Sequence, residues 1–257
     1  MMKKLLLFMA SCLISFSLVA SDYAKEKRWA DQTVDSILDG EAVWLKAGER
    51  EFLSIFTPDE DEQLSDGVIV IHGTGIHPNW DQVVQPLRVE LTTLGWSTLA
   101  IQMPILANDA DHDDYAPLYP EVIPRIDAAI NYLKALGIER IYLVSHSQGA
   151  LMTSYYLSLK QPGIIQGFVA IGMPGAAKYP AMDSLIALKQ FALPMLDLYG
   201  SEDLPQVLAA RDDKRKAALS VTGRDFEQIE IKSANHFFNG RNDILIKTVN
   251  QWLVKHR

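Results

Sequence analysis

The stretch YLVSHSQGAL, residues 142–151, places Ser147 between an apolar run and a segment with helical composition. Small residues, Ser145 and Gly149, stand two positions before and two positions after it. A strand that turns sharply into a helix exposes a serine hydroxyl at the turn, and only small residues fit at those two positions. The usual pattern has glycine where this chain has Ser145. The stretch therefore indicates either an activated serine nucleophile or a polar residue in an ordinary strand–helix joint.

Strand-like and helix-like segments alternate on both sides of this stretch. Unbroken or alternating apolar runs predict strands over 67–73, 97–104, 138–145, 165–174, 193–200 and 226–233. Helical spacing predicts helices over 22–40, 80–96, 119–137, 148–163 and 242–256, with Pro124 limiting where the third of them becomes regular. Residues 41–58 alternate on either side of Gly48 and predict a hairpin. This alternation predicts the α/β class, with one mostly parallel sheet covered by helices on both faces.

Length and composition fit one globular domain. A chain of 257 residues buries about three quarters of its unfolded surface and needs no disulfide or metal to hold it together. Its hydrophobic content of 48% and charged content of 22% exclude a disordered chain. The net charge of −8, with no cluster of lysine and arginine, argues against nucleic acid as a partner.

The N-terminus, MMKKLLLFMASCLISFSLVASDYA, has the order of a secretory signal peptide. Two lysines precede an apolar stretch that ends near Ala20, and small and polar residues follow. We expect a signal peptide over residues 1–20, cleaved near Ala20 or Ser21, and a single mature domain over 21–257. The alternatives are an uncleaved membrane anchor, for which the stretch is short, and a lipoprotein signal at Cys12, which would leave an apolar tail. The expected location is periplasmic or secreted, with no stable membrane insertion after cleavage.

The run VIVIHGTG ends an earlier predicted strand at His72 and Gly73. A glycine there lets the backbone approach a substrate, and the N–H of Thr74 is then a candidate oxyanion donor. The N–H of Gln148, directly after Ser147, is the second candidate. The rival interpretation is a dinucleotide-binding loop, but its glycine pattern fails because Pro78 stands where the third glycine is needed.

Chain order identifies a candidate base. A serine on a strand–turn–helix is followed along the chain by an acid and then by a histidine. Only His236 and His256 follow Ser147 with an acid between. His256 is the penultimate residue, whereas His236 follows the last predicted strand in the loop KSANHFFNG. His236 is therefore the better base.

The acid has more than one candidate. Asp203 follows a predicted strand in LYGSEDLP, at the sheet edge where it can orient the imidazole. Glu202 is its immediate rival and Asp183 a more distant one. Asp197 lies within the strand, which favours a structural role.

The motifs VIVIHGTG, SHSQGA, LYGSED and ANHFF together resemble the α/β-hydrolase superfamily, over roughly residues 65–257. The segment from HGTGIHPNW to STLAIQMP is similar to a little-characterised group of exported bacterial proteins with that fold. The resemblance implies a nucleophile, acid and base at Ser147, Asp203 and His236, with oxyanion donors at Thr74 and Gln148. The sequence departs from the family pattern at Ser145.

Several further residues flank these positions. The candidates for a substrate pocket are His72, Gly73, His77, Trp80 and His146, and for His77 and Trp80 simple packing remains equally open. Residues 175–193 are expected to form a small lid-like insertion. The acidic run NDADHDDY, 108–115, has the first spacings of a calcium loop but lacks its glycine, so we expect a solvated loop near the mouth of the site.

The sequence thus predicts a serine hydrolase that cleaves carboxylic esters through an acyl-enzyme on Ser147. We expect a small-molecule acyl substrate and no metal or organic cofactor, and the sequence carries no signal for an oligomeric state. Two alternatives remain: an exported binding protein that keeps the fold without turnover, and an acyltransferase with the same three residues.

Overall fold

The computed structural model describes residues 21–61 and 65–257, so the predicted signal peptide lies outside the described residues. Its centre is one eight-stranded sheet with the order β1-β2-β4-β3-β5-β6-β7-β8. The strands are β1 Glu41–Ala47, β2 Arg50–Thr57, β3 Asp66–Ile71, β4 Ser97–Ile101, β5 Arg140–His146, β6 Ile165–Ile171, β7 Met195–Glu202 and β8 Phe226–Asn235.

Strand direction gathers the functional loops at one edge of the sheet. β1 pairs with β2, and β2 with β4, in antiparallel fashion; every other neighbouring pair is parallel. The carboxyl ends of β3, β5, β7 and β8 therefore meet at the same edge, where ligands of open α/β sheets bind. The loop after each of these strands carries one of the predicted site residues.

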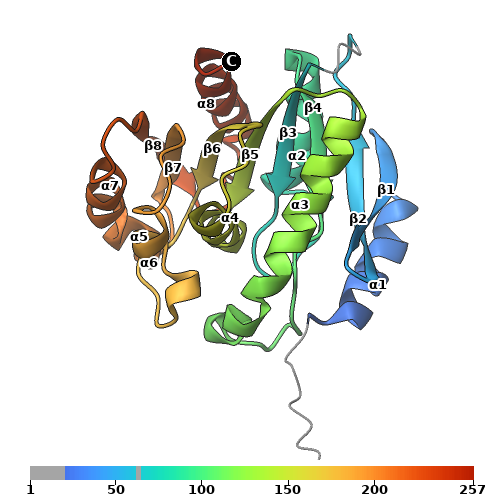
Figure 1. The fold of residues 1–257 in the computed structure, drawn as a ribbon, viewed down its shortest axis with the longest axis horizontal. Helices are drawn as coiled ribbons and strands as arrows, with labels where there is room; N and C mark the ends of the chain where they lie inside the picture. The colour runs from blue at the N-terminus through green and yellow to red at the C-terminus, as the bar shows by residue number, and fades with distance from the viewer. Residues whose placement is uncertain (1–20, 62–64) are drawn as a thin grey trace, which may run out of the picture.

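Helices cover both faces of the sheet (Figure 1). One apolar layer packs α3 and α4 against the sheet, and a second packs α2 and α8 against the opposite face. The α-helices are α1 Tyr23–Val34, α2 Val84–Glu90, α3 Tyr119–Ala135, α4 Gln148–Leu159, α5 Ser184–Ala187, α6 Pro205–Ala209, α7 Arg211–Leu219 and α8 Asn242–Lys255. Three 3₁₀ helices join them: η1 Thr92–Leu94, η2 His112–Leu118 and η3 Pro180–Met182. The predicted α/β class, with helices on both faces of a mostly parallel sheet, is confirmed.

The first helix is shorter than predicted. α1 ends at Val34, whereas the sequence pattern extended it to Gly40. Gly40 instead lies against β2, where a Cβ atom would come within 2.4 Å of the Phe56 carbonyl oxygen. This glycine therefore serves a close approach of two backbones and not a helix end.

Pro124 does not delay the start of α3, although the sequence predicted that it would limit where the regular helix begins. Pro124 lies inside a helix that begins at Tyr119. A proline removes one backbone donor there, but the buried side chains of Val122, Ile126 and Ala129 fix the helix on the sheet. Tertiary packing thus outweighs a local preference.

The segment between β7 and β8 holds two helices, α6 and α7, that the sequence pattern did not reveal. The 175–193 segment, predicted as a lid, contains η3 and the short α5. Among the described residues, no helix combines the length and apolar character needed to cross a bilayer.

Candidate active site

Ser147 stands on a strained turn between β5 and α4. Its φ of 54° and ψ of −122° lie in a region that side chains rarely adopt. Its N–H donates to the Ile171 carbonyl at 2.8 Å, which ties the turn to β6. Gly149 follows in the first turn of α4, where a Cβ atom would lie 2.3 Å from the His72 carbonyl oxygen. The turn therefore needs glycine at this position for close approach.

Ser145 fits the turn without strain. It is absent from the residues with positive φ, so its position does not require glycine. Its side chain is buried, and its Oγ lies 2.8 Å from Thr153 Oγ1 on α4. The departure from the usual pattern thus adds a hydrogen bond between strand and helix.

Ser147, His236 and Asp203 form one chain of hydrogen bonds. His236 Nε2 lies 3.0 Å from Ser147 Oγ, and His236 Nδ1 lies 2.6 Å from Asp203 Oδ1. A carboxylate only accepts, so Nδ1 carries a hydrogen, and Nε2 of the ring in its neutral form is placed to accept the serine hydroxyl proton. This is the geometry of a nucleophile, a base and an orienting acid.

The acid is held in its charged form. Burial alone would raise the pKa of Asp203, but the hydrogen bond from His236, and the positive charge of that ring whenever it is protonated, act in the opposite direction. The N–H groups of Leu204, at 2.7 Å, and Gly200, at 3.3 Å, add to this effect, and the pKa of Asp203 lies below its usual value. Asp203 is therefore a carboxylate at neutral pH and keeps His236 oriented.

The other acidic candidates lie elsewhere. Glu202 is exposed at the end of β7, and Asp183 accepts backbone N–H groups at the start of α5. Asp197 forms a buried ion pair of 2.8 Å with Lys214. His256 lies at the end of α8 and not at this edge of the sheet.

A cavity of about 440 Å³ opens beside Ser147. Thr74 and Gln148 line it together with the serine. Gln148 is the first residue of α4, and N–H groups in the first turn of a helix have no partner within the helix. Gly73 runs so close that a Cβ atom on it would lie 3.2 Å from Ser147 Cβ. The two predicted oxyanion donors thus belong to backbone segments on either side of the serine.

Two buried histidines form hydrogen bonds to the loops that carry Thr74 and His236. His72 Nδ1 donates to the Gly73 carbonyl at 2.7 Å, and its Nε2 accepts the Met103 N–H at 2.9 Å. His146 Nε2 donates to the His236 carbonyl at 2.9 Å. Burial lowers the pKa of each of these imidazoles to about 3, so both are neutral. His72 thus holds the loop after β3, which contains Thr74 and is called the oxyanion loop below, and His146 holds the loop of His236.

None of the five predicted pocket residues is among the residues that line the cavity. The described residues that line it are Thr74, His112, Asp113, Ser147, Gln148, Pro174, Ala176, Ala177, Lys178, Leu204 and Gln206. His72, Gly73, His77, Trp80 and His146 are not among them. The His77 ring packs 4.7 Å from Trp29 of α1 and 5.4 Å from Trp80. These two residues join α1 to the loop after β3.

The structure reveals site residues that the sequence pattern did not. Gly172, after β6, has a φ of 58°, and a Cβ atom on it would lie 3.0 Å from the His236 ring. Asp113 and Lys178 meet at 3.7 Å on the rim of the cavity. The acidic run thus lies at the mouth, as expected, and residues 176–178 contribute to the cavity wall. A glycine directly after a buried strand was the available signal for Gly172.

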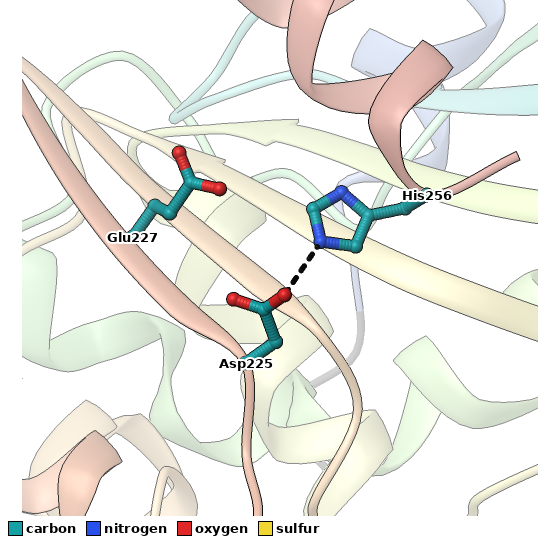
Figure 2. A group of neighbouring side chains, drawn as sticks. All are labelled: Asp225, Glu227 and His256. Atoms are coloured by element: carbon teal, nitrogen blue, oxygen red, sulfur yellow. Dashed lines mark hydrogen bonds and ion pairs between the residues drawn. The ribbon is translucent and has the colours of Figure 1, made fainter.

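One group of described side chains has the spacing of a metal site. The ligand atoms of Asp225, Glu227 and His256 lie within 4.8 Å of one another (Figure 2). Lys255 already forms ion pairs with both carboxylates, and His256 Nε2 lies 3.2 Å from Asp225. Two of these residues, Asp225 and Glu227, lie at the start of β8, away from Ser147. The carboxylates of the 108–115 loop do not form such a group among the described residues.

Solved structures share this fold. Est1E from Butyrivibrio proteoclasticus, in the structure described as having ferulic acid bound, has a TM-score of 0.68 at 15% identity, with 84% of this chain and 99% of that chain covered. Dienelactone hydrolase from Anabaena variabilis has a TM-score of 0.67 at 18% identity, with 84% and 96% covered. An alpha-beta serine hydrolase homologue from Coxiella burnetii has a TM-score of 0.62 at 20% identity, with 84% and 98% covered. At these identities the likeness shows the α/β-hydrolase fold.

A search of curated protein sequences found no significant match. One family described as "Protein of unknown function (DUF3530)" matches residues 20–119 and 107–255, which together span the described chain almost entirely. The chain therefore belongs to the DUF3530 family, and its fold is that of the α/β hydrolases.

Proposed function

We propose that this protein is an exported serine hydrolase that cleaves small carboxylic esters. The observation that carries the proposal is the hydrogen-bonded chain from Asp203 through His236 to Ser147 on a strained turn. Strain of this kind persists only where the surrounding structure over-determines it, and it clusters at active sites. The signal-like sequence of residues 1–20 supports export.

The first half of the reaction forms an acyl-enzyme. Ser147 Oγ attacks the ester carbonyl carbon while His236 Nε2 takes the hydroxyl proton. The carbonyl oxygen becomes an oxyanion and accepts hydrogen bonds from the N–H groups of Thr74 and Gln148. The bond to the alcohol oxygen then breaks, and His236 returns the proton to that oxygen. The alcohol leaves, and the acyl group stays on Ser147.

The second half repeats these steps with water. His236 takes a proton from the water, the water oxygen attacks the acyl carbon, and the second oxyanion uses the same two N–H groups. Collapse of this intermediate releases the carboxylic acid and returns the proton to Ser147. Asp203 stays ionised throughout and stabilises the imidazolium.

The cavity supports small substrates with an apolar portion. Its volume of about 440 Å³ falls in the range of small-molecule sites. Beyond the rim pair of Asp113 and Lys178 lies an apolar hollow of about 530 Å³, lined by Asp113, Asp114, Ala116, Pro117, Tyr179, Pro180 and Ala181. This hollow gives a longer acyl or alcohol group a place outside the reaction centre. Est1E, in the structure described as having ferulic acid bound, and the dienelactone hydrolase have similar folds. These descriptions support a hydrolase that acts on small carboxylic esters.

The test is steady-state hydrolysis of 4-nitrophenyl esters with acetyl, butyryl and octanoyl groups. We expect turnover by the wild type, loss of turnover in Ser147→Ala, and a higher kcat/KM for butyryl than for acetyl esters. A folded wild-type protein that hydrolyses none of them, and no thioester or amide either, would overturn the proposal.

A further inference from the structure

Ser21 is a buried part of the fold although it directly follows the predicted signal segment. Only 4% of its surface is exposed. Its backbone nitrogen donates to Glu121 Oε1 at 3.0 Å, and its Oγ accepts the Ile105 N–H at 2.9 Å. The same Oγ contacts the Glu26 carboxylate. Residue 21 therefore has a defined place between α1, α3 and the loop after β4.

The next residue continues this pattern. The Asp22 N–H donates to the Ile105 carbonyl at 2.7 Å, and its side chain accepts the Lys25 N–H at 2.9 Å, which caps α1. Cleavage after Ser21 would remove the buried hydroxyl and its contacts, whereas cleavage after Ala20 would keep them. The structure thus separates two cleavage positions that the sequence left open.

Two carboxylates and one guanidinium group contact each other beside Ser21. Arg125 forms ion pairs with Glu26 at 2.9 Å and with Glu121 at 3.7 Å. The side chains of Arg125 and Glu26 are 3% and 8% exposed. The Glu121 side chain is 25% exposed, and its Oε2 accepts the Tyr23 hydroxyl at 2.9 Å. A positive charge on the Ser21 nitrogen would therefore pair with a carboxylate that is partly open to water, where an ion pair contributes modestly to stability.

We propose that the Ala20–Ser21 bond is the processing site and that the freed α-ammonium group of Ser21 forms an ion pair with Glu121. A signal peptidase hydrolyses the bond: water supplies the oxygen of the Ala20 carboxylate, and the amide nitrogen leaves as the Ser21 amine and takes up a proton. An amide nitrogen at 3.0 Å from Glu121 Oε1 brings one hydrogen bond and no charge. An ammonium group there keeps the hydrogen bond and adds a full positive charge beside the Glu121 carboxylate.

This anchor also fixes the helix that supports the oxyanion loop. Lys25 of α1 donates to the Leu106 carbonyl at 2.7 Å, and its Nζ lies 3.4 Å from where a Cβ atom on Gly75 would stand. Trp29 of α1 packs on His77. The mature N-terminus is therefore tied, through α1, to residues 75–77.

The first test is the intact mass of the protein that cells export from the full-length chain. We expect the mass of residues 21–257. A mass that corresponds to any other first residue overturns the proposal, and this result is independent of catalysis by Ser147.

The second test compares thermal unfolding of exported wild type with a chain that has a glycine inserted between Ala20 and Ser21. The inserted glycine moves the ammonium group away from Glu121, and we expect the melting temperature to fall by about 2–4 °C. The difference should vanish in a Glu121→Gln background and persist in Glu90→Gln, which alters an exposed carboxylate on α2. An equal difference in both backgrounds contradicts the ion pair.

A chemical measurement needs no variant. Periodate oxidises an N-terminal serine to an aldehyde, because only there do a free amine and a hydroxyl stand on adjacent carbons. We expect the exported protein to react about tenfold more slowly when folded than in denaturant, since Ser21 is buried. Equal rates in the two conditions would show that the N-terminus is not held in the fold.

Discussion

The rings of His146 and His236 lie with their centroids 4.7 Å apart, and His146 Nε2 donates to the His236 backbone carbonyl at 2.9 Å. His146, the residue directly before Ser147, thus holds the loop that carries His236. Because burial lowers its pKa to about 3, His146 is a neutral donor near pH 7. In the proposed reaction it would act through His236, because it is not among the residues that line the cavity.

We expect His146→Phe to lower kcat/KM for ester hydrolysis by about tenfold, the effect of losing one buried hydrogen bond. The ring contact stays, so the loss belongs to the orientation of His236. Steady-state kinetics with 4-nitrophenyl butyrate measures it, with His256→Phe, at the end of α8 and outside the cavity, as the matched control. Unchanged kinetics in His146→Phe would remove this residue from the account.

Asp203→Asn is expected to lower kcat by about 10³–10⁴-fold, because an amide fixes the wrong tautomer of the imidazole. Glu202→Gln is the matched control, since Glu202 is adjacent in sequence but exposed. It should retain wild-type activity. Equal losses in the two variants would argue against Asp203 as the orienting acid.

The strained backbone conformation of Ser147 should lower the free energy of unfolding of the protein. A φ of 54° with a ψ of −122° suits glycine and strains any residue with a Cβ atom. We expect Ser147→Gly to be more stable than Ser147→Ala by about 1 kcal/mol, measured by urea unfolding. The opposite order would mean that the turn is not strained.

Gly149 should not tolerate a methyl group. A Cβ atom there meets the His72 carbonyl oxygen at 2.3 Å, whereas at Gly163 it meets nothing within 4 Å. Gly149→Ala is expected to lower the free energy of unfolding by about 2–4 kcal/mol and to reduce activity. Gly163→Ala, as the control, should change it by less than about 0.5 kcal/mol.

Stability should fall as the solution is acidified. The unfolded chain protonates His72 and His146 below about pH 6.5, while in the folded chain the pKa of each lies at about 3. Between these values the unfolded state binds more protons, so the free energy of unfolding falls by about 1.4 kcal/mol per pH unit for each histidine. Urea unfolding at pH 7.0, 6.0 and 5.0 measures the slope. His146→Phe should have a slope smaller by one histidine, and an unchanged slope would contradict the buried neutral state of His146.

The positions of Ser147, Asp203 and His236 followed from the sequence because each stands directly after a strand. The carboxyl ends of parallel strands share one edge, so chain order alone brings those three loops together. For His77 and Trp80 the sequence left a pocket wall and simple packing open. Both stand shortly after Thr74 in the chain, but their rings pack against Trp29 of α1.

Local sequence patterns do not predict contacts between segments that are far apart in the chain. Ser21 meets Ile105 and Glu121, and no periodicity near residue 21 indicates either partner. The two helices between β7 and β8 are short, and their composition is strongly polar in α7, so they lack an apolar stripe that stands out from a loop. The end of α1 depends on the approach of Gly40 to β2, which is again a contact made only in the fold.

The most direct test of the central claim is labelling of exported protein with a fluorophosphonate, followed by intact mass and peptide mapping. A serine activated by His236 attacks the phosphorus, displaces fluoride and keeps a stable adduct. The account predicts one adduct per chain, on Ser147, absent in Ser147→Ala and formed about a hundredfold or more slowly in His236→Ala. A folded wild-type protein that forms no adduct, or forms it on another residue, would contradict the assignment of Ser147 as the nucleophile.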